Sequence, residues 1–400
     1  MIATSQKATR EQTKLHNKRL ILKIVYNQGL ISRADLARMT SLTATTVSAA
    51  VGELLAEGLV EEVGSISTER GKPPTLIQLV KDANFALALD LSRKVIRGGI
   101  LNLRGESKRQ HNISLHDRMG DQAVEVIYEM IDALLVDAPQ PILGIGIGAP
   151  GIIDSQRGYV QRAVNLSWLN LPLRDLLKKR YNLAASVVND NQAALLAEYH
   201  FGRYRNQEHL VVIRLGNGIG AGMVLNRQLL HSYGVGEIGH VTVVENGSVC
   251  SCGNVGCLET VASSRAIVKQ AQSIALHNSN STLAPMLHEP GGITMEAVLE
   301  AFAAGDPTLR PLVENVGHYL GIAIANLIGV LGLTKILLAG SVAQIGQPLL
   351  EIVRQEVCQR SLTARLNPPT IDLVDVRPDI SDTILLGAAT ALFADELGLF

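Results

Sequence analysis

The residue types that could do chemistry are concentrated in one short stretch of the chain. His240 is followed by Cys250, Cys252 and Cys257, so one imidazole and three thiols lie within 18 residues. This is the donor set of a tetrahedral zinc site, and the glycines between the cysteines let a loop fold around an ion. No position is left for an activated water, so we expect a structural zinc ion. The alternatives are three unrelated buried thiols or a disulfide, although Cys250 and Cys252 are too close in an extended segment to bridge without strain.

Two carboxylates flank this stretch. Glu237 precedes the histidine by three residues, and Glu259 follows the last cysteine by two. A metal that pins the loop would orient both carboxylates and His240 toward a crevice, where groups that accept several hydrogen bonds suit the hydroxyls of a sugar. The alternative is that both are surface charges. Cys358 lies far downstream, and we expect it to be a plain buried thiol.

The N-terminal part of the chain has the pattern of a DNA-binding module. An apolar helical pattern ends at Gly29, Ser32 is placed to cap a short helix over 33–39, and Thr43 is placed to cap a third helix over 44–57. Two short helices joined by a tight turn form a helix-turn-helix, whose second helix enters the major groove of DNA by its N-terminal end. We therefore predict DNA contacts from the hydroxyls at that end and from a nearby cation: Thr43, Thr45, Thr46, Ser48 and Arg33.

A polar hairpin follows the third helix. Residues 58–64 and 75–80 are expected to form its strands, and its tip carries Arg70 and Lys72 beside two prolines. Two cations on a stiff, extended segment fit a phosphate backbone or a minor groove, so the hairpin is a candidate wing. The alternatives are that a small helical domain uses the hairpin for dimerisation, or that the N-terminal module binds a protein.

Composition sets the broad class of the protein. The 400 residues carry a net charge of −1, with 47% hydrophobic and 18% charged residues, which excludes long disorder and predicts two or three domains. Residues 1–81 hold 11 Lys and Arg against 7 Asp and Glu, a basic balance that suits nucleic acid. No apolar run could span a membrane and no signal peptide is visible, so we expect a cytoplasmic protein whose four cysteines form no disulfide framework.

The rest of the chain alternates strands and helices. The predicted strands are 85–91, 96–103, 142–148, 185–188, 209–215, 223–225 and 335–339, and the predicted helices are 125–136, 192–199, 316–330 and 383–392. Such alternation predicts α/β layers in two halves, with ligands in the crevice between the halves. A Gly-rich loop is expected over 216–222.

These features together resemble the ROK family of repressors, open reading frames and kinases, in its branch of sugar-responsive transcriptional repressors. The most specific motif is Gly-Glu-Ile-Gly-His followed by Cys-x-Cys-Gly-x-x-Gly-Cys-x-Glu at 236–259, and the resemblance covers nearly the whole chain. It implies an α/β fold with a winged helix-turn-helix (1–82) before a two-lobed, actin-like (RNase H-like) body, its smaller lobe 83–200 with 383–400 and its larger lobe 201–382. It assigns zinc to His240, Cys250, Cys252 and Cys257, and sugar contacts to Asn165, Asn189, Asp190, Glu237, His240 and Glu259.

Three loops favour a repressor over the sugar kinases of the same family. Kinase members carry Asp-x-Gly-Gly-Thr on the first hairpin, whereas this chain has Asp90-Leu91-Ser92-Arg93-Lys94, without the glycines that let backbone approach ATP phosphates. Asn217 replaces a Thr or Ser in the second loop, and the third, 339–341, lacks paired glycines. The kinase general base is retained as Asp190, but a carboxylate that binds a sugar hydroxyl explains it equally well. We expect no enzyme activity and no catalytic residue, with an ATP-dependent sugar kinase as the alternative.

The resulting hypothesis is a sugar-responsive repressor of carbohydrate-utilisation genes, similar to xylose-, N-acetylglucosamine- and glucose-responsive members. Its expected partners are operator DNA, a sugar or sugar-phosphate effector, and further copies of the chain in a homodimer or homotetramer. Two winged helices would bind a palindromic operator, and sugar binding would close the lobes and change the spacing of the DNA-binding units. Sugar and DNA would then oppose each other by one coupling free energy, about 1–3 kcal/mol.

Overall fold

The computed structural model describes residues 9–65, 75–91, 94–230, 234–374 and 382–400. By its contacts the chain divides into two compact units, Met1–Asp190 with Pro378–Phe400, and Asn191–Arg377. Within the described residues, no helix is both long and apolar enough to cross a membrane.

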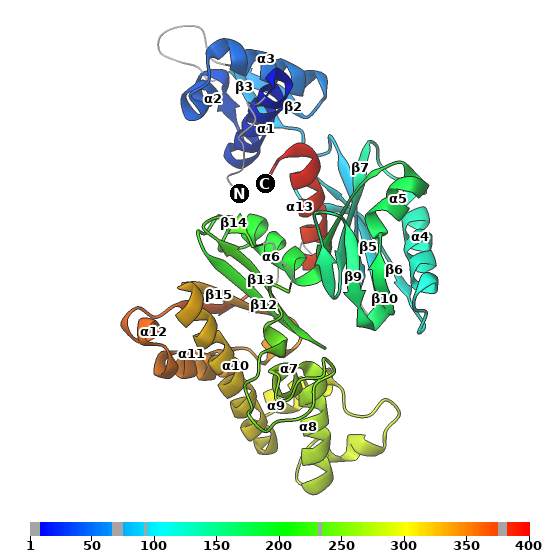
Figure 1. Cartoon of the computed structure of the whole chain (residues 1–400), viewed down its shortest axis with the longest axis vertical. Coiled ribbons are helices and arrows are strands. Elements are labelled where there is room, and N and C mark those ends of the chain that lie inside the picture. Colours follow the sequence, from blue (N-terminus) through cyan, green and yellow to red (C-terminus); the bar gives the residue numbers. More distant parts are fainter. Residues whose placement is uncertain (1–8, 66–74, 92–93, 231–233, 375–381) are drawn as a thin grey trace, which may run out of the picture. The chain divides into compact units, whose positions relative to one another are not determined.

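The first unit begins with a winged helix-turn-helix (Figure 1). Its elements are α1 (Arg10–Gln28), β1 (Ile31–Ser32), α2 (Arg33–Thr40), α3 (Ala44–Ala56), β2 (Val60–Ser65) and β3 (Thr75–Leu79), with the strands in the order β1-β3-β2. The predicted caps are confirmed, because the Ser32 hydroxyl accepts from the Asp35 N–H and the Thr43 hydroxyl from the Thr46 N–H. Val47 and Leu54 of α3 and Ile21 of α1 are fully buried, and the two helices are in contact.

The C-terminal end of the chain contacts α1. Arg19 Nη2 donates to the backbone carbonyls of Asp395 and Glu396, both at 3.0 Å. These carbonyls lie in the last turn of α13 (Thr383–Leu397), where a cation complements the helix dipole. Tyr26 of α1 meets Phe400 edge to face, with ring centroids 5.0 Å apart. The DNA-binding module is therefore joined to the rest of its unit by contacts as well as by the chain.

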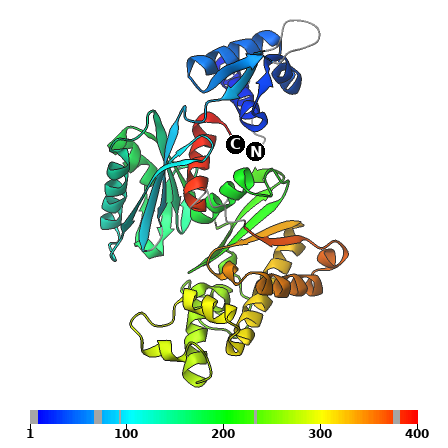
Figure 2. The same ribbon diagram turned by 180° about the vertical axis from the view of Figure 1, so that it is seen from behind.

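A five-stranded sheet forms the centre of the rest of the first unit. Its strand order is β11-β7-β4-β5-β6, built from β4 (Phe85–Leu91), β5 (Val95–Asn102), β6 (Ser107–Ser114), β7 (Ile142–Ala149) and β11 (Ala184–Asn189). In both views α13 covers one face and α4 (Asp121–Leu135) the other (Figures 1 and 2). The alternating sequence of β7 explains this: Ile145 and Ile147 belong to the core cluster with α4, whereas a Cβ on Gly146 would lie 2.2 Å from the Ala388 carbonyl of α13.

A small antiparallel sheet and one more helix complete this unit. The sheet consists of β8 (Ile152–Asp154), β9 (Tyr159–Ala163) and β10 (Trp168–Leu171), and α5 (Leu173–Tyr181) follows it. No strand pattern in the sequence predicted this sheet. Trp168 Nε1 donates to the Gly120 carbonyl at 2.9 Å, which ties β10 to the segment before α4.

The second unit contains another five-stranded sheet with the same pattern. Its order is β14-β13-β12-β15-β16, from β12 (Leu210–Leu215), β13 (Ile219–Leu225), β14 (Gln228–Leu229), β15 (Lys335–Ala339) and β16 (Thr370–Leu373). In both sheets three antiparallel neighbours are followed by two strands added in parallel. The first of the three lies next to the parallel pair in each case. This repeated topology is the α/β body that the sequence predicted.

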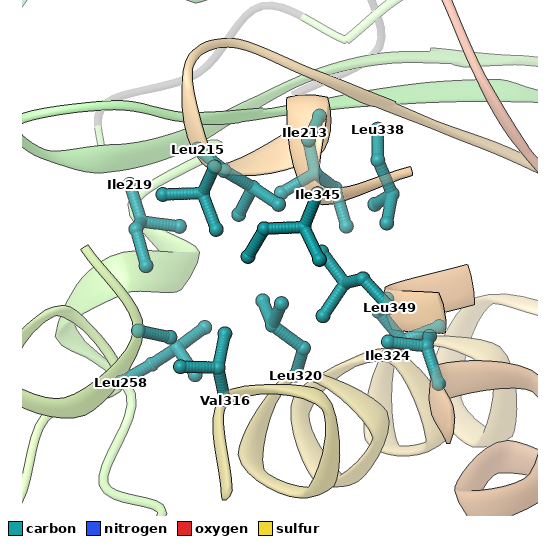
Figure 3. Packing of buried hydrophobic residues seen from close by; sticks show 14 of the residues in the cluster. Ile213, Leu215, Ile219, Leu258, Val316, Leu320, Ile324, Leu338, Ile345 and Leu349 are labelled. Carbon is teal, nitrogen blue, oxygen red and sulfur yellow. The ribbon is translucent and has the colours of Figure 1, made fainter. Parts of the chain in front are cut away.

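Helices cover both faces of the second sheet. Leu195 and Tyr199 of α6 (Asp190–Phe201) pack on one face with Val212 and Leu337. The other face forms a large core with α10 (Arg310–Leu331) and α11 (Gln347–Arg360), where Ile213 and Leu338 meet Leu320 of α10 and Leu349 of α11 (Figure 3). The remaining helices are α7 (Glu259–Ala262), α8 (Ser264–His277), α9 (Met295–Ala303) and α12 (Leu362–Leu366).

The structure corrects the expected loop over 216–222. β13 already begins at Ile219, so the last glycines of this run are strand residues. A Cβ on Gly220 would lie 2.3 Å from the Asn191 side chain, and one on Gly222 would lie 2.5 Å from the Asn191 carbonyl. These two glycines therefore let α6 approach the strand closely and do not mark a turn.

Candidate functional site

The four sequence-predicted ligands converge in the second unit. One ligand atom from each of His240, Cys250, Cys252 and Cys257 lies within 4.8 Å of all the others. His240 Nδ1 is 3.6 Å from Cys250 Sγ, and Cys252 Sγ is 3.7 Å from Cys257 Sγ. The cysteines are free, so the disulfide alternative is wrong. Three sulfurs and one nitrogen in this arrangement could hold a metal ion.

The local backbone brings these ligands together. His240 ends a 3-10 turn, Ile238–His240, and isolated bridges pair Thr242 with Cys257 and Val249 with Val255. Gly256 makes the return possible, because its φ is 73° and an added Cβ would lie 1.7 Å from the Val244 carbonyl. The loop thus folds back on itself and places residues far along the segment beside the histidine.

The environment of the thiols fits a cation. Burial, with the neighbouring sulfurs, raises the pKa of the Cys257 thiol to about 12. A hydrogen bond from the Asn254 backbone lowers the pKa of Cys252. A buried thiol with a raised pKa gives up its proton when a cation replaces that proton. Cys358 lies outside this cluster and is half-buried rather than fully buried.

Glu237 stands on the far side of the same imidazole. Its Oε2 lies 3.8 Å from His240 Nε2, while Nδ1 of the ring faces Cys250. A carboxylate beside the second nitrogen of a metal-binding histidine orients the ring and selects its tautomer. The side chains of both residues are half-exposed.

Glu259 is held by the backbone and by a cation. Its Oε2 accepts from the Ile219 N–H at 3.2 Å and its Oε1 pairs with Arg265 Nη2 at 3.0 Å. The side chain is only 11% exposed. The alternative that Glu259 is a surface charge is therefore wrong.

The first unit places a second polar group at one edge of its sheet. Strands β4, β7 and β11 are parallel, so their carboxyl ends meet there and bring Asp90, Gly151 and Asn189 to the same edge. Asn189 Nδ2 donates to the Gly151 carbonyl at 2.8 Å. Asp190 follows directly as the first residue of α6, whereas Asn165 lies exposed in the turn between β9 and β10.

The predicted DNA contacts differ in their surroundings. Thr45 and Ser48 are exposed on α3, whereas the Thr43 and Thr46 hydroxyls lie 2.9 Å apart and serve the helix cap. Arg33 Nη1 pairs with Glu62 of β2 at 2.7 Å. Arg70 and Lys72 lie outside the described residues.

Sequence reasoning missed two arginines that organise these sites. Arg265 joins Glu259 to the loop after β12, and Arg97 pairs with the buried carboxylates of Asp90 and Asp382. No sequence signal marked either one, because each acts on residues of another element. Arg97 also neutralises the carboxylate of Asp90, which begins the stretch where kinase members carry their phosphate loop. This pairing disfavours the kinase alternative.

Comparison with known proteins identifies the body and the N-terminal module separately. The model of the ROK family matches residues 86–393, and a winged helix-turn-helix DNA-binding model matches residues 15–61. The chain belongs to the ROK family. The winged module makes it a ROK protein of the regulator type, as the sequence predicted.

Individual relatives support the same division. The chain is 30% identical over 388 residues to a xylose repressor from Caldicellulosiruptor bescii, covering 95% of this chain and 96% of that repressor. It is 34% identical over 276 residues to a glucokinase from Halalkalibacterium halodurans, which covers only 67% of this chain and 84% of the kinase. The crystal structure of a ROK family transcriptional regulator, a homologue of E. coli MLC, superposes with a TM-score of 0.85 at 29% identity and covers 97% of this chain and 98% of its own.

Proposed function

We propose that this protein is a sugar-responsive transcriptional repressor that binds operator DNA through its winged helix. The supporting observation is that a DNA-binding module and a ROK body occur in one chain, and that a xylose repressor and a ROK regulator match it from end to end. From those relatives we infer that the repressed genes serve carbohydrate utilisation and that xylose is the first candidate effector. Because operator DNA lies in the cytoplasm of bacteria such as those of the relatives, we propose that this protein is cytoplasmic.

The effector contacts that we propose are polar groups of the types that bind sugar hydroxyls. They are Asn165, Asn189 and Asp190 of the first unit and Glu237, His240 and Glu259 of the second. Carboxylates, amides and imidazoles are the side chains that hydrogen-bond and orient sugar hydroxyls. The effector is a free sugar or its phosphate.

We propose that the metal ion is zinc and that its role is structural. In a tetrahedron with Zn–S near 2.3 Å and Zn–N near 2.0 Å, the S···S and S···N edges are about 3.8 and 3.5 Å. The separations of 3.7 and 3.6 Å agree with those edges. Zinc bound here would fix the loop and hold His240 against Glu237.

We further propose three functional parts and a symmetric assembly. The parts are the winged helix 1–82, the lobe 83–200 with 383–400, and the lobe 201–382. Thr43, Thr45, Thr46 and Ser48, with Arg33 and the wing residues Arg70 and Lys72, would contact DNA. A homodimer or homotetramer would present two such modules to a palindromic operator.

A gel-shift series tests the central proposal. The DNA is the region upstream of the chain's own gene, and the sugars are xylose, glucose, N-acetylglucosamine and their phosphates. We expect a sequence-specific complex whose affinity changes by at least about fivefold with one sugar, the low end of typical coupling. The absence of any specific complex, or a complex indifferent to every sugar, contradicts the proposal.

A sugar kinase is the second candidate, because a glucokinase is 34% identical over part of the chain and the family resemblance assigns the position of the kinase base to Asp190. A coupled ADP-release assay over the same sugars decides between the two. Turnover that disappears in Asp190→Asn would favour the kinase.

A further inference from the structure

The Gly-rich loop after β12 is closed onto the start of α8. The Ser264 hydroxyl donates to the side-chain oxygen of Asn217 at 3.1 Å, and the Ser264 backbone N–H donates to the Gly216 carbonyl at 2.8 Å. Arg265 Nε donates to the Asn217 carbonyl, also at 2.8 Å. Three hydrogen bonds from two consecutive residues therefore fix this loop.

The same arginine also fixes Glu259. Its Nη2 lies 3.0 Å from Glu259 Oε1, while Glu259 Oε2 accepts from the Ile219 N–H. An added Cβ on Gly218 would lie 2.9 Å from that oxygen, so the loop and the carboxylate are in close contact. A carboxylate offers about four acceptor positions, and these two bonds leave about two for other donors.

The position of Arg265 is not explained by the stability of its own helix. It lies in the first turn of α8, which contains no acidic residue. The helix dipole disfavours a cation at this end. Its side chain is half-exposed, yet it makes two directed contacts outside its own helix, to Asn217 and to Glu259.

We propose that Arg265 is a positioning residue for the effector sugar. It holds the Glu259 carboxylate in one orientation, and it locks the 216–219 loop against that carboxylate, so that the remaining acceptor positions of Glu259 are directed for sugar hydroxyls. The proposal rests on the proposed function, because it takes Glu259 to be a sugar contact. A planar guanidinium can pair with a carboxylate and donate to a carbonyl at once, which a lysine ammonium does less well.

Sugar affinity in the full-length protein is the first test. Arg265→Ala, Arg265→Lys and a matched control, Arg310→Ala, are titrated calorimetrically with the sugar that binds the wild type in a xylose, glucose and N-acetylglucosamine panel. Arg310 is an exposed arginine in the first turn of α10 that pairs with Glu314 at 3.0 Å. We expect Arg265→Ala to raise the Kd for the sugar by about tenfold or more, which corresponds to the loss of one charge-assisted contact. Arg265→Lys should recover part of the lost affinity.

Two controls separate positioning from general damage. Zinc content and operator affinity without sugar should stay within about twofold of the wild type in Arg265→Ala, because neither involves this contact directly. Equal sugar affinity in Arg265→Ala and the wild type overturns the proposal. An equal loss in Arg310→Ala overturns it as well.

Hydrogen exchange tests the same idea without any sugar. We expect the amides of residues 216–222 to exchange faster in Arg265→Ala than in the wild type and in Arg310→Ala, because Ile219 N–H loses its fixed acceptor. If the wild type binds no sugar, the proposed function fails, and this measurement still decides whether Arg265 positions Glu259 and the loop. Unchanged exchange overturns the proposal.

Discussion

Arg97 Nε lies 2.9 Å from Asp382 Oδ2, which ties a strand of the first hairpin to the residue that caps α13. Asp382 accepts through its other oxygen from the Ile384 N–H at 2.9 Å. The same guanidinium pairs with Asp90, whose side chain is 2% exposed. One cation thus joins β4, β5 and the N-terminus of α13.

Arg97→Ala should destabilise the protein. The substitution removes the guanidinium that contacts the buried carboxylates of Asp90 and Asp382, and breaking a buried ion pair costs about 3 kcal/mol or more. Urea unfolding of the purified protein measures the loss, and Arg97→Ala with Asp90→Asn should recover part of it because one of the two charges is gone. Arg157→Ala is the control, since Arg157 is exposed and its ion pair with Asp154 is a weak surface contact. Equal stability of Arg97→Ala and Arg157→Ala would show that the network contributes nothing.

Asp306 predicts a stability that depends on pH. Burial by itself would raise the pKa of its carboxyl, but hydrogen bonds from the hydroxyls and backbone N–H groups of Thr308 and Thr282 outweigh that effect and hold the pKa at about 2. The folded pKa is below the unfolded value of 3.8, so the stabilisation is complete above about pH 4 and is lost as the pH falls toward 2. A difference of this size corresponds to about 2 kcal/mol.

Asp306→Asn is the corresponding test. At pH 7 it should lower the free energy of unfolding by about 2 kcal/mol, because an amide cannot accept all five bonds and adds donors of its own. The gap between wild type and variant should narrow below pH 4. Asp117→Asn, an exposed aspartate, should behave like the wild type throughout. A gap that stays constant from pH 7 to pH 3 contradicts the assigned pKa.

Cys252→Ser should remove zinc and loosen the loop. Loss of a residue that only hydrogen-bonds to a metal ligand already lowers metal affinity by about tenfold or more. Loss of a thiolate ligand itself should lower it further. Atomic absorption measures zinc per chain, and limited proteolysis reports cleavage within 240–257. Cys358→Ser is the matched control, because that thiol lies outside the cluster. A full zinc complement in Cys252→Ser would refute the assignment.

Thr43 and Thr45 should respond differently to the same change. Thr43→Ala removes the cap of α3 and should lower stability by about 1 kcal/mol. Thr45→Ala should leave stability unchanged and weaken operator binding, since Thr45 is exposed at the start of the same helix. Thermal melts and fluorescence anisotropy with operator DNA give both quantities, and Thr13→Ala in α1 controls for the loss of a hydroxyl. Unaltered operator affinity in Thr45→Ala would exclude a contact there.

The sequence predicted best where the interacting groups are close along the chain. Ser32 and Thr43 cap helices within three residues, and the four candidate metal ligands all lie within 18 residues of one another along the chain. Gly220 and Gly222 were misread as turn residues, because their neighbour Asn191 lies on another element.

By itself the chain determined its module types, its helix caps and the donor set of its metal loop, all of which depend on local spacing and residue chemistry. Only the tertiary structure decided which polar and charged groups meet across the chain. Arg97 reaches Asp382, Arg265 reaches Asn217, and Ser281 reaches Asp306 across long stretches of chain. Such pairs depend on how sheets and helices pack. Packing sets the distance between two groups and their burial, and these determine the strength of the electrostatic interaction.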